Sequence, residues 1–110
     1  MSRWITEKAM QTYKEAIAID PQNRRSHFSL GMTLALSKQY REAVYHLNRV
    51  KELGPESETE RAKYPISYHK LSFSALAICY ERLDGSGKAM SVLEELISCY
   101  PDDIEAKKAS

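Results

Sequence analysis

The stretch AVYHLNRVKELGP at residues 43–55 recurs in altered form as AMQTYKEAIAIDP at residues 9–21 and as AMSVLEELISCYP at residues 89–101. Each copy begins with alanine, has a large side chain four positions later and ends with proline twelve positions after the alanine. The first two prolines are 34 residues apart and the last two are 46 apart, so the third copy is delayed by 12 residues. A repeat with a period of this length is typical of stacked structural units.

Apolar side chains within these copies recur at intervals of three and four residues, which places them on one face of an α-helix. The proline at the end of each copy fits a helix boundary. A residue without a backbone N–H can follow one helix or precede the next without the loss of a helical hydrogen bond. The sequence therefore predicts an all-α chain, in which Asn23 caps the second helix. Helices are expected over residues 4–19, 24–37, 40–53, 66–83 and 86–99, with a further helical start from residue 103.

Thirteen residues before its alanine, each of the two later copies has a leucine followed by a small residue, namely Leu30–Gly31 and Leu76–Ala77. Small side chains at such positions let two antiparallel helices approach closely. In this order and spacing the pattern resembles the tetratricopeptide repeat, although His27 stands where Phe73 provides the family's aromatic residue in the third copy. The resemblance implies antiparallel helical hairpins stacked as a right-handed α-solenoid of about two and a half repeats.

In this register, residues 1–110 form a single repeat domain, which we interpret as an excerpt of a longer array. The first helix of the first repeat would lie almost wholly before Met1. The expected segments are the second helix of a truncated repeat at 4–23, a full repeat at 24–57, an insertion at 58–69, a full repeat at 70–103 and the start of a further or capping helix at 104–110.

The insertion is the part of the chain that the repeat pattern does not explain. Ser57 and Glu60 have the spacing of a capping box, which favours a short helix or an extra turn, whereas Pro65 disfavours helix at the residue before it. Two interpretations stay open. Tyr64 and Tyr68 contact a partner at the rim of the stack, or the insertion is an elongated helix end that covers the neighbouring repeat.

The glycine-rich stretch DGSGKAM at residues 84–90 raises the question of a phosphate-binding loop. The P-loop motif would need glycine at position 82 and serine or threonine at position 89, where the chain has Arg82 and Ala89. The stretch is expected instead to be a turn between paired helices, with Gly85 at positive φ and Ser86 as an N-cap. Because no other constellation of nucleophile, acid and base emerges, we expect neither an enzyme nor a cofactor.

The composition excludes several classes of partner. The 110 residues carry a formal net charge of +1, with 43% hydrophobic and 28% charged residues, as in an ordinary globular domain. So small a charge does not favour binding to nucleic acid, and no segment is long and apolar enough for a membrane. The chain is expected in the cytoplasm or the nucleus, and without a metal, since its two cysteines and three histidines lack the spacing of ligands.

By resemblance, the first helix of each hairpin lines a concave surface that holds a helix or an extended peptide of a protein partner. The residues expected there are Arg25, Phe28, Ser29, Met32, Ser74, Ile78 and Arg82. Leu36 and Leu71 lie on the same helix faces and are either core or contact residues. A clamp for the C-terminal carboxylate of chaperones is not expected, because the places where the family has lysine, asparagine and arginine are occupied by Ser29, Leu71 and Ala75.

The alternative is a structural role. Open ends of a helical stack expose apolar surface unless they are covered. The chain would then be a scaffold segment that packs on neighbouring repeats, or self-associates as a homo-oligomer, within a multiprotein complex. Trp4, Ile5 and Ile104 are the residues expected at such edges.

Overall fold

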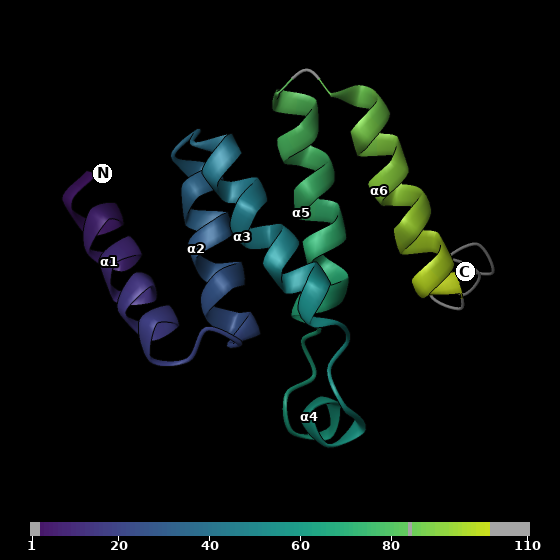
Figure 1. Cartoon of the computed structure of the whole chain (residues 1–110), viewed down its shortest axis with the longest axis horizontal. Helices are drawn as coiled ribbons and strands as arrows, with labels where there is room; N and C mark the ends of the chain where they lie inside the picture. The colour runs from purple at the N-terminus through teal and green to yellow at the C-terminus, as the bar shows by residue number, and fades with distance from the viewer. Residues whose placement is uncertain (1–2, 84, 102–110) are drawn as a thin grey trace.

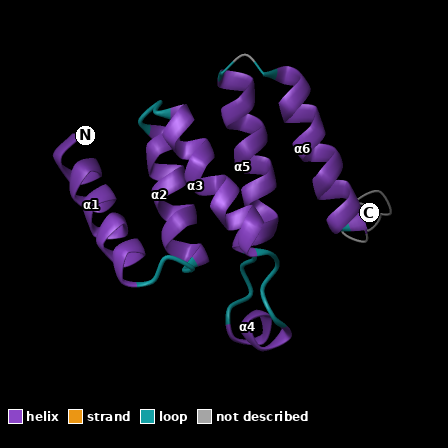
Figure 2. Cartoon of the chain, viewed as in Figure 1, coloured by secondary structure: helices purple, strands orange, loops and turns teal. Residues whose placement is uncertain are grey.

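The computed structural model describes residues 3–83 and 85–101, and this part of the chain contains six helices and no strand (Figure 2). The helices are α1 (Arg3–Ile19), α2 (Arg24–Leu36), α3 (Tyr40–Leu53), α4 (Glu58–Lys63), α5 (Tyr68–Arg82) and α6 (Ser86–Cys99). The all-α prediction is therefore confirmed. The helical start expected from residue 103 lies outside the described residues.

The long helices pack in sequence order, α1 on α2, α2 on α3, α3 on α5 and α5 on α6, and α2 also contacts α5. Figure 1 shows them following one another along the longest axis, with α1 and α6 at opposite ends. Helices α2 and α3 form one hairpin, α5 and α6 form a second, and α1 precedes both. The short helix α4 projects away from this layer (Figure 1). This arrangement is the stack of hairpins that the repeat predicts, and its right-handed twist stays a prediction.

Local sequence signals start and stop several of these helices. The side chain of Asn23 accepts a hydrogen bond from the backbone N–H of Ser26, so Asn23 is the N-cap of α2 as predicted. Ser57 and Glu60 form the predicted capping box at the start of α4. Gly54 ends α3 with φ +80°, a backbone conformation that favours glycine because other side chains clash there.

Three expectations about helix ends are wrong. Helix α5 begins at Tyr68 instead of residue 66, because the Ser67 side chain accepts from the N–H of Lys70 and caps the helix there. Gly85 has φ −121° and is itself the residue before α6, so it does not take positive φ and Ser86 is not the N-cap. The N–H of Gly85 instead donates to the carbonyl oxygen of Tyr80 and closes the turn.

The insertion does not extend a neighbouring helix. Residues 64–67 separate α4 from α5 as a non-helical segment, and none of the residues of α4 is buried. The interpretation of the insertion as an elongated helix end that covers a repeat is therefore wrong. The restriction that Pro65 places on Tyr64 accounts for the break, since Tyr64 has extended backbone with φ −129° and ψ 106°.

The long helices bury one apolar core. Its largest fully buried hydrophobic side chains are Leu30, Leu34, Leu47, Val50, Phe73, Leu76 and Cys79. A Cβ atom on Gly31 would lie 2.8 Å from Cγ of Leu47, which is closer than packed atoms tolerate, and 3.4 Å from the carbonyl oxygen of Ala43, at the edge of ordinary contact. The expected close approach of two helices at this position, α2 and α3, is therefore confirmed.

Candidate functional site

The residues predicted for the concave surface lie on one face of α2 and one face of α5, which we call the α2/α5 face. Arg25, Ser74, Ile78 and Arg82 are exposed, whereas Phe28, Ser29 and Met32 are half-buried. Phe28 and Met32 pack against the apolar core, and the ring of Phe28 lies 5.3 Å from that of Tyr68. The structure thus divides the predicted set into exposed residues and residues that also support the fold.

The two leucines that the sequence left open belong to the surface. Leu36 is 82% exposed and Leu71 is 44% exposed, so neither is a core residue. Leu71 and Ile78, which is 55% exposed, are seven residues apart on one face of α5, and Leu36 lies on the corresponding face of α2. The α2/α5 face therefore presents apolar side chains to solvent between the basic residues Arg25 and Arg82.

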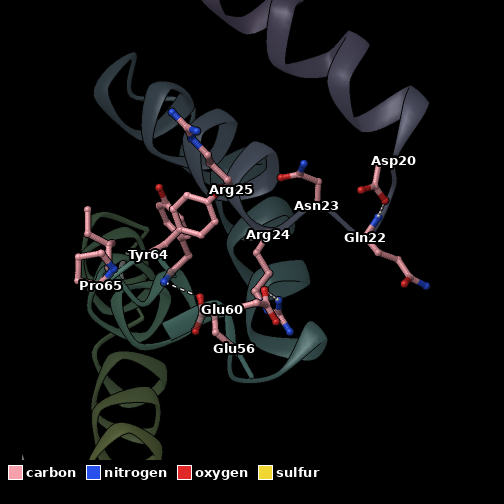
Figure 3. A pocket seen from close by; sticks show the side chains of 11 residues that line it. Asp20, Gln22, Asn23, Arg24, Arg25, Glu56, Glu60, Tyr64 and Pro65 are labelled. Carbon is pink, nitrogen blue, oxygen red and sulfur yellow. Dashed lines mark hydrogen bonds and ion pairs between the residues drawn. The ribbon is translucent and has the colours of Figure 1, made fainter. Parts of the chain in front are cut away.

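A cleft of about 590 Å³ lies next to this face, between the α1–α2 turn and the insertion (Figure 3). The turn and the start of α2 provide one wall, and the insertion with the start of α5 provides the other. The lining residues are Asp20, Gln22, Asn23, Arg24, Arg25, Glu56, Glu60, Tyr64, Pro65, Ile66 and Tyr68. The structure brings Arg25 of the predicted concave set together with both predicted rim tyrosines.

Arg24 fixes the insertion to the rest of the stack. Its Nε donates to the carbonyl oxygen of Gly54 at 2.8 Å, and its Nη2 donates to those of Leu53 and Pro55 at 3.3 and 3.2 Å. Its Nη1 pairs with Oε2 of Glu60 at 3.0 Å. Arg24 therefore satisfies carbonyls at the end of α3 and anchors α4 at the same time.

Glu56 holds the other end of the insertion. Its buried carboxylate accepts from Oγ of Ser67 at 2.8 Å and from the N–H groups of Tyr68 and His69 at 2.8 and 3.3 Å. Burial raises the pKa of Glu56, but these hydrogen bonds to the charged form outweigh burial and lower the pKa below its usual value. The carboxylate thereby caps the start of α5.

Two histidines take part in partly buried polar contacts that join helices. His27 Nε2 donates to the carbonyl oxygen of Pro21 at 2.8 Å, and the Nδ1 atoms of His27 and His46 lie 3.1 Å apart. Burial lowers the pKa of His46, and the neighbouring His27 lowers it further. These contacts fix the α1–α2 turn against α2 and α3, so they position one wall of the cleft.

His69 connects the two ends of the second hairpin. Its Nδ1 lies 2.6 Å from the hydroxyl oxygen of Tyr100, which follows α6. Burial lowers the pKa of His69 and raises that of Tyr100. The contact ties the end of α6 to the start of α5. No sequence pattern indicates this pairing.

The structure describes two of the three residues that are expected at the edges of the stack. Trp4 and Ile5 are exposed on α1, whereas Ile104 lies outside the described residues. Helix α6 adds an edge that the sequence analysis missed, because Met90, Leu93 and Ile97 are exposed along one of its faces.

Within residues 3–83 and 85–101, no three histidine, cysteine or acidic side chains are grouped so that they could hold a metal ion. None of the described helices has the length and apolar character required to cross a bilayer.

Comparison with known proteins adds one finding. The sequence model described as "Tetratricopeptide repeat" matches residues 6–23, which cover most of α1 and the turn after it. No curated protein matches the chain significantly. The matched segment contains the first copy of the internal repeat, and two helical hairpins follow it, the second of them after the 12-residue insertion. The match therefore supports the assignment of this repeat pattern to the tetratricopeptide repeat family.

Proposed function

We propose that this chain is a protein–protein interaction module that binds a helix or an extended segment of a partner on the α2/α5 face. Tetratricopeptide repeats in general mediate such interactions and are not catalytic modules. The observation that carries the proposal is the exposure of Leu36, Leu71 and Ile78 on two adjacent helices of one stack. Exposed apolar side chains that gather on one surface mark interaction sites more often than single exposed residues do.

The chemistry of the face favours an amphipathic partner. Arg25 lies in the first turn of α2 and Arg82 in the last turn of α5, and the exposed apolar side chains lie on the same faces of these two helices. An amphipathic helix or an extended segment with apolar anchors and acidic flanks matches this order. A carboxylate clamp stays outside the proposal, because Ser29, Leu71 and Ala75 stand where the family has lysine, asparagine and arginine.

The variant Ile78→Glu tests this function. It places a charge at the centre of the face, and because Ile78 is exposed the helices should still fold. We expect capture of the cellular partner on the immobilised chain to fall at least about tenfold, with unchanged far-UV circular dichroism. Ser91→Glu, which adds the same charge at an exposed position of α6, is the matched control. Equal capture by Ile78→Glu and the unmodified chain would contradict the assignment of this face.

A second candidate function is that of a scaffold segment, and one observation favours it. In the repeat register, Met90, Leu93 and Ile97 of α6 correspond to Met10, Tyr13 and Ile17 of α1. The α1 residues pack partly buried against the core alongside α2, whereas their α6 counterparts are exposed. The α6 surface is thus equivalent to one that elsewhere in the chain receives a helix.

Light scattering tests the scaffold function. If the α6 surface or the Trp4 edge of α1 mediates self-association, the unmodified chain will show a concentration-dependent increase in mass. Met90→Glu or Trp4→Ser should weaken that association, because each removes apolar area from an edge. A monomer at all concentrations would leave no role for either edge in self-association.

A further inference from the structure

The charges of the cleft are unevenly compensated. Arg24 and Glu60 pair with each other, and the carboxylate of Glu56 is satisfied by the start of α5. Asp20 accepts a hydrogen bond from the N–H of Gln22 at the opposite end of the cleft from Tyr64 (Figure 3). Arg25, in contrast, makes no hydrogen bond or ion pair with any of the residues that the structure describes. The cleft therefore contains one cation that is free to bind an anion.

An apolar wall lies beside this cation. Tyr64 is 60% exposed and Ile66 is 54% exposed, and both belong to the non-helical segment that returns from α4 to α5. Pro65 lies between them, and the half-buried Tyr68 closes the wall where its ring meets Phe28. Such side chains offer apolar contact area at a small cost in conformational entropy, because aromatic rings and proline are stiff.

The cleft is held open by polar contacts at its base. Helix α4 has no buried residue, so apolar packing does not account for its position. Arg24 binds it from α2, and Glu56 binds the segment that follows it. A site that is formed before binding loses less entropy when a ligand is ordered on it.

We propose that this cleft binds an acidic, extended segment of a protein partner. A carboxylate of the segment pairs with the guanidinium of Arg25, and a neighbouring apolar side chain packs on Tyr64 and Ile66. Arg25 belongs to both the cleft and the α2/α5 face, and Phe28 of that face contacts Tyr68 of the cleft. This continuity favours a peptide over an isolated small molecule. The proposal deepens the proposed function by fixing the end of the α2/α5 face at which the acidic part of a partner lies.

Two matched peptides test the proposal. The N-acetylated peptide amide GELPEG carries carboxylates and apolar anchors, and GQLPQG is its uncharged counterpart. In nuclear magnetic resonance titrations of the full chain, GELPEG should shift the amide signals of residues 20–25 and 56–68. We expect GELPEG to bind about tenfold more tightly than GQLPQG at low salt, because hydrogen bonds between charged groups are the stronger ones.

Substitutions then test whether Arg25 is the cation that binds the carboxylates of GELPEG. Arg25→Gln should remove the preference for GELPEG, whereas Arg41→Gln, at another exposed arginine on α3, should keep it. Tyr64→Ser, also at an exposed position, should weaken both peptides to a similar extent, because it removes the apolar wall. Equal binding of the two peptides, a preference that survives Arg25→Gln, or the absence of saturable GELPEG binding would each overturn the proposal.

The peptide titration tests the cleft and the capture assay tests the α2/α5 face, so each proposal can fail without the other. If GELPEG does not bind but Ile78→Glu still prevents capture of the cellular partner, the α2/α5 face stands and the cleft proposal falls. If GELPEG binds through Arg25 but Ile78→Glu has no effect on capture, the cleft stands and the α2/α5 face falls.

Discussion

Replacing Gly31 with leucine should lower the free energy of unfolding by about 3 kcal/mol, because the new side chain has no space where α2 crosses α3. Even a single Cβ at this position would lie 2.8 Å from Cγ of Leu47. Leu47 is fully buried, so it cannot turn aside into solvent. Either the two helices separate or neighbouring side chains leave their preferred rotamers, and both responses cost packing energy.

Urea unfolding followed by far-UV circular dichroism measures this loss, and two alanine variants provide the controls. Alanine is about 1 kcal/mol more favourable than glycine within a helix. At Gly87, where an added Cβ meets nothing within 4 Å, Gly87→Ala should therefore stabilise the chain. Gly31→Ala should show no such gain, since its Cβ meets Leu47. A Gly31→Leu chain as stable as the unmodified one would show that α2 and α3 do not cross closely.

Replacing Glu56 with alanine should destabilise the chain by about 2 to 3 kcal/mol, because a buried acceptor of three hydrogen bonds is lost. The hydroxyl of Ser67 and the N–H groups of Tyr68 and His69 would be left without their acceptor at the start of α5. Glu56→Gln, which keeps the size and one acceptor oxygen, should lose about half as much. Urea unfolding again provides the measurement, and equal stability of all three chains would contradict the capping role.

The contribution of Glu56 also has a defined pH dependence. Its pKa is lowered in the folded chain relative to the usual value of 4.5, so the folded state favours the charged carboxylate. The stabilisation is complete above about pH 4.5 and is lost as the pH falls through the lowered folded pKa. The difference in stability between the unmodified chain and Glu56→Gln should therefore shrink on acidification. A difference that is constant over this range would show that the charge of Glu56 does not stabilise α5.

Local signals account for how well the fold could be predicted. Asn23, Gly54 and the Ser57–Glu60 pair each act within a few residues of their own position, so a helix end can be read from its neighbours in the sequence. The role of Glu56 could not be predicted from neighbouring residues. It reaches forward across the whole insertion to cap α5, and its partners are the backbone N–H groups of Tyr68 and His69, which every residue except proline has.

The candidate site could be predicted only in fragments. Arg25, Tyr64 and Tyr68 were assigned to two separate surfaces, a groove and a rim, and the structure places them around one cleft. Arg24 was not predicted, because its hydrogen-bond acceptors are carbonyl groups about thirty positions away, which have no sequence signature.

The helices, their order and the small residue where α2 crosses α3 could be predicted from the sequence, because periodicity, caps and the internal repeat are properties of neighbouring residues. Which residues of each helix face solvent depends on how the helices pack. Leu36 is exposed whereas Leu34, two positions earlier, is buried, since exposure depends on which neighbouring helix covers each face. The tertiary structure also decided that the insertion stands off the stack and forms a cleft, because Arg24 and Glu56 hold it through groups that are far apart in the chain.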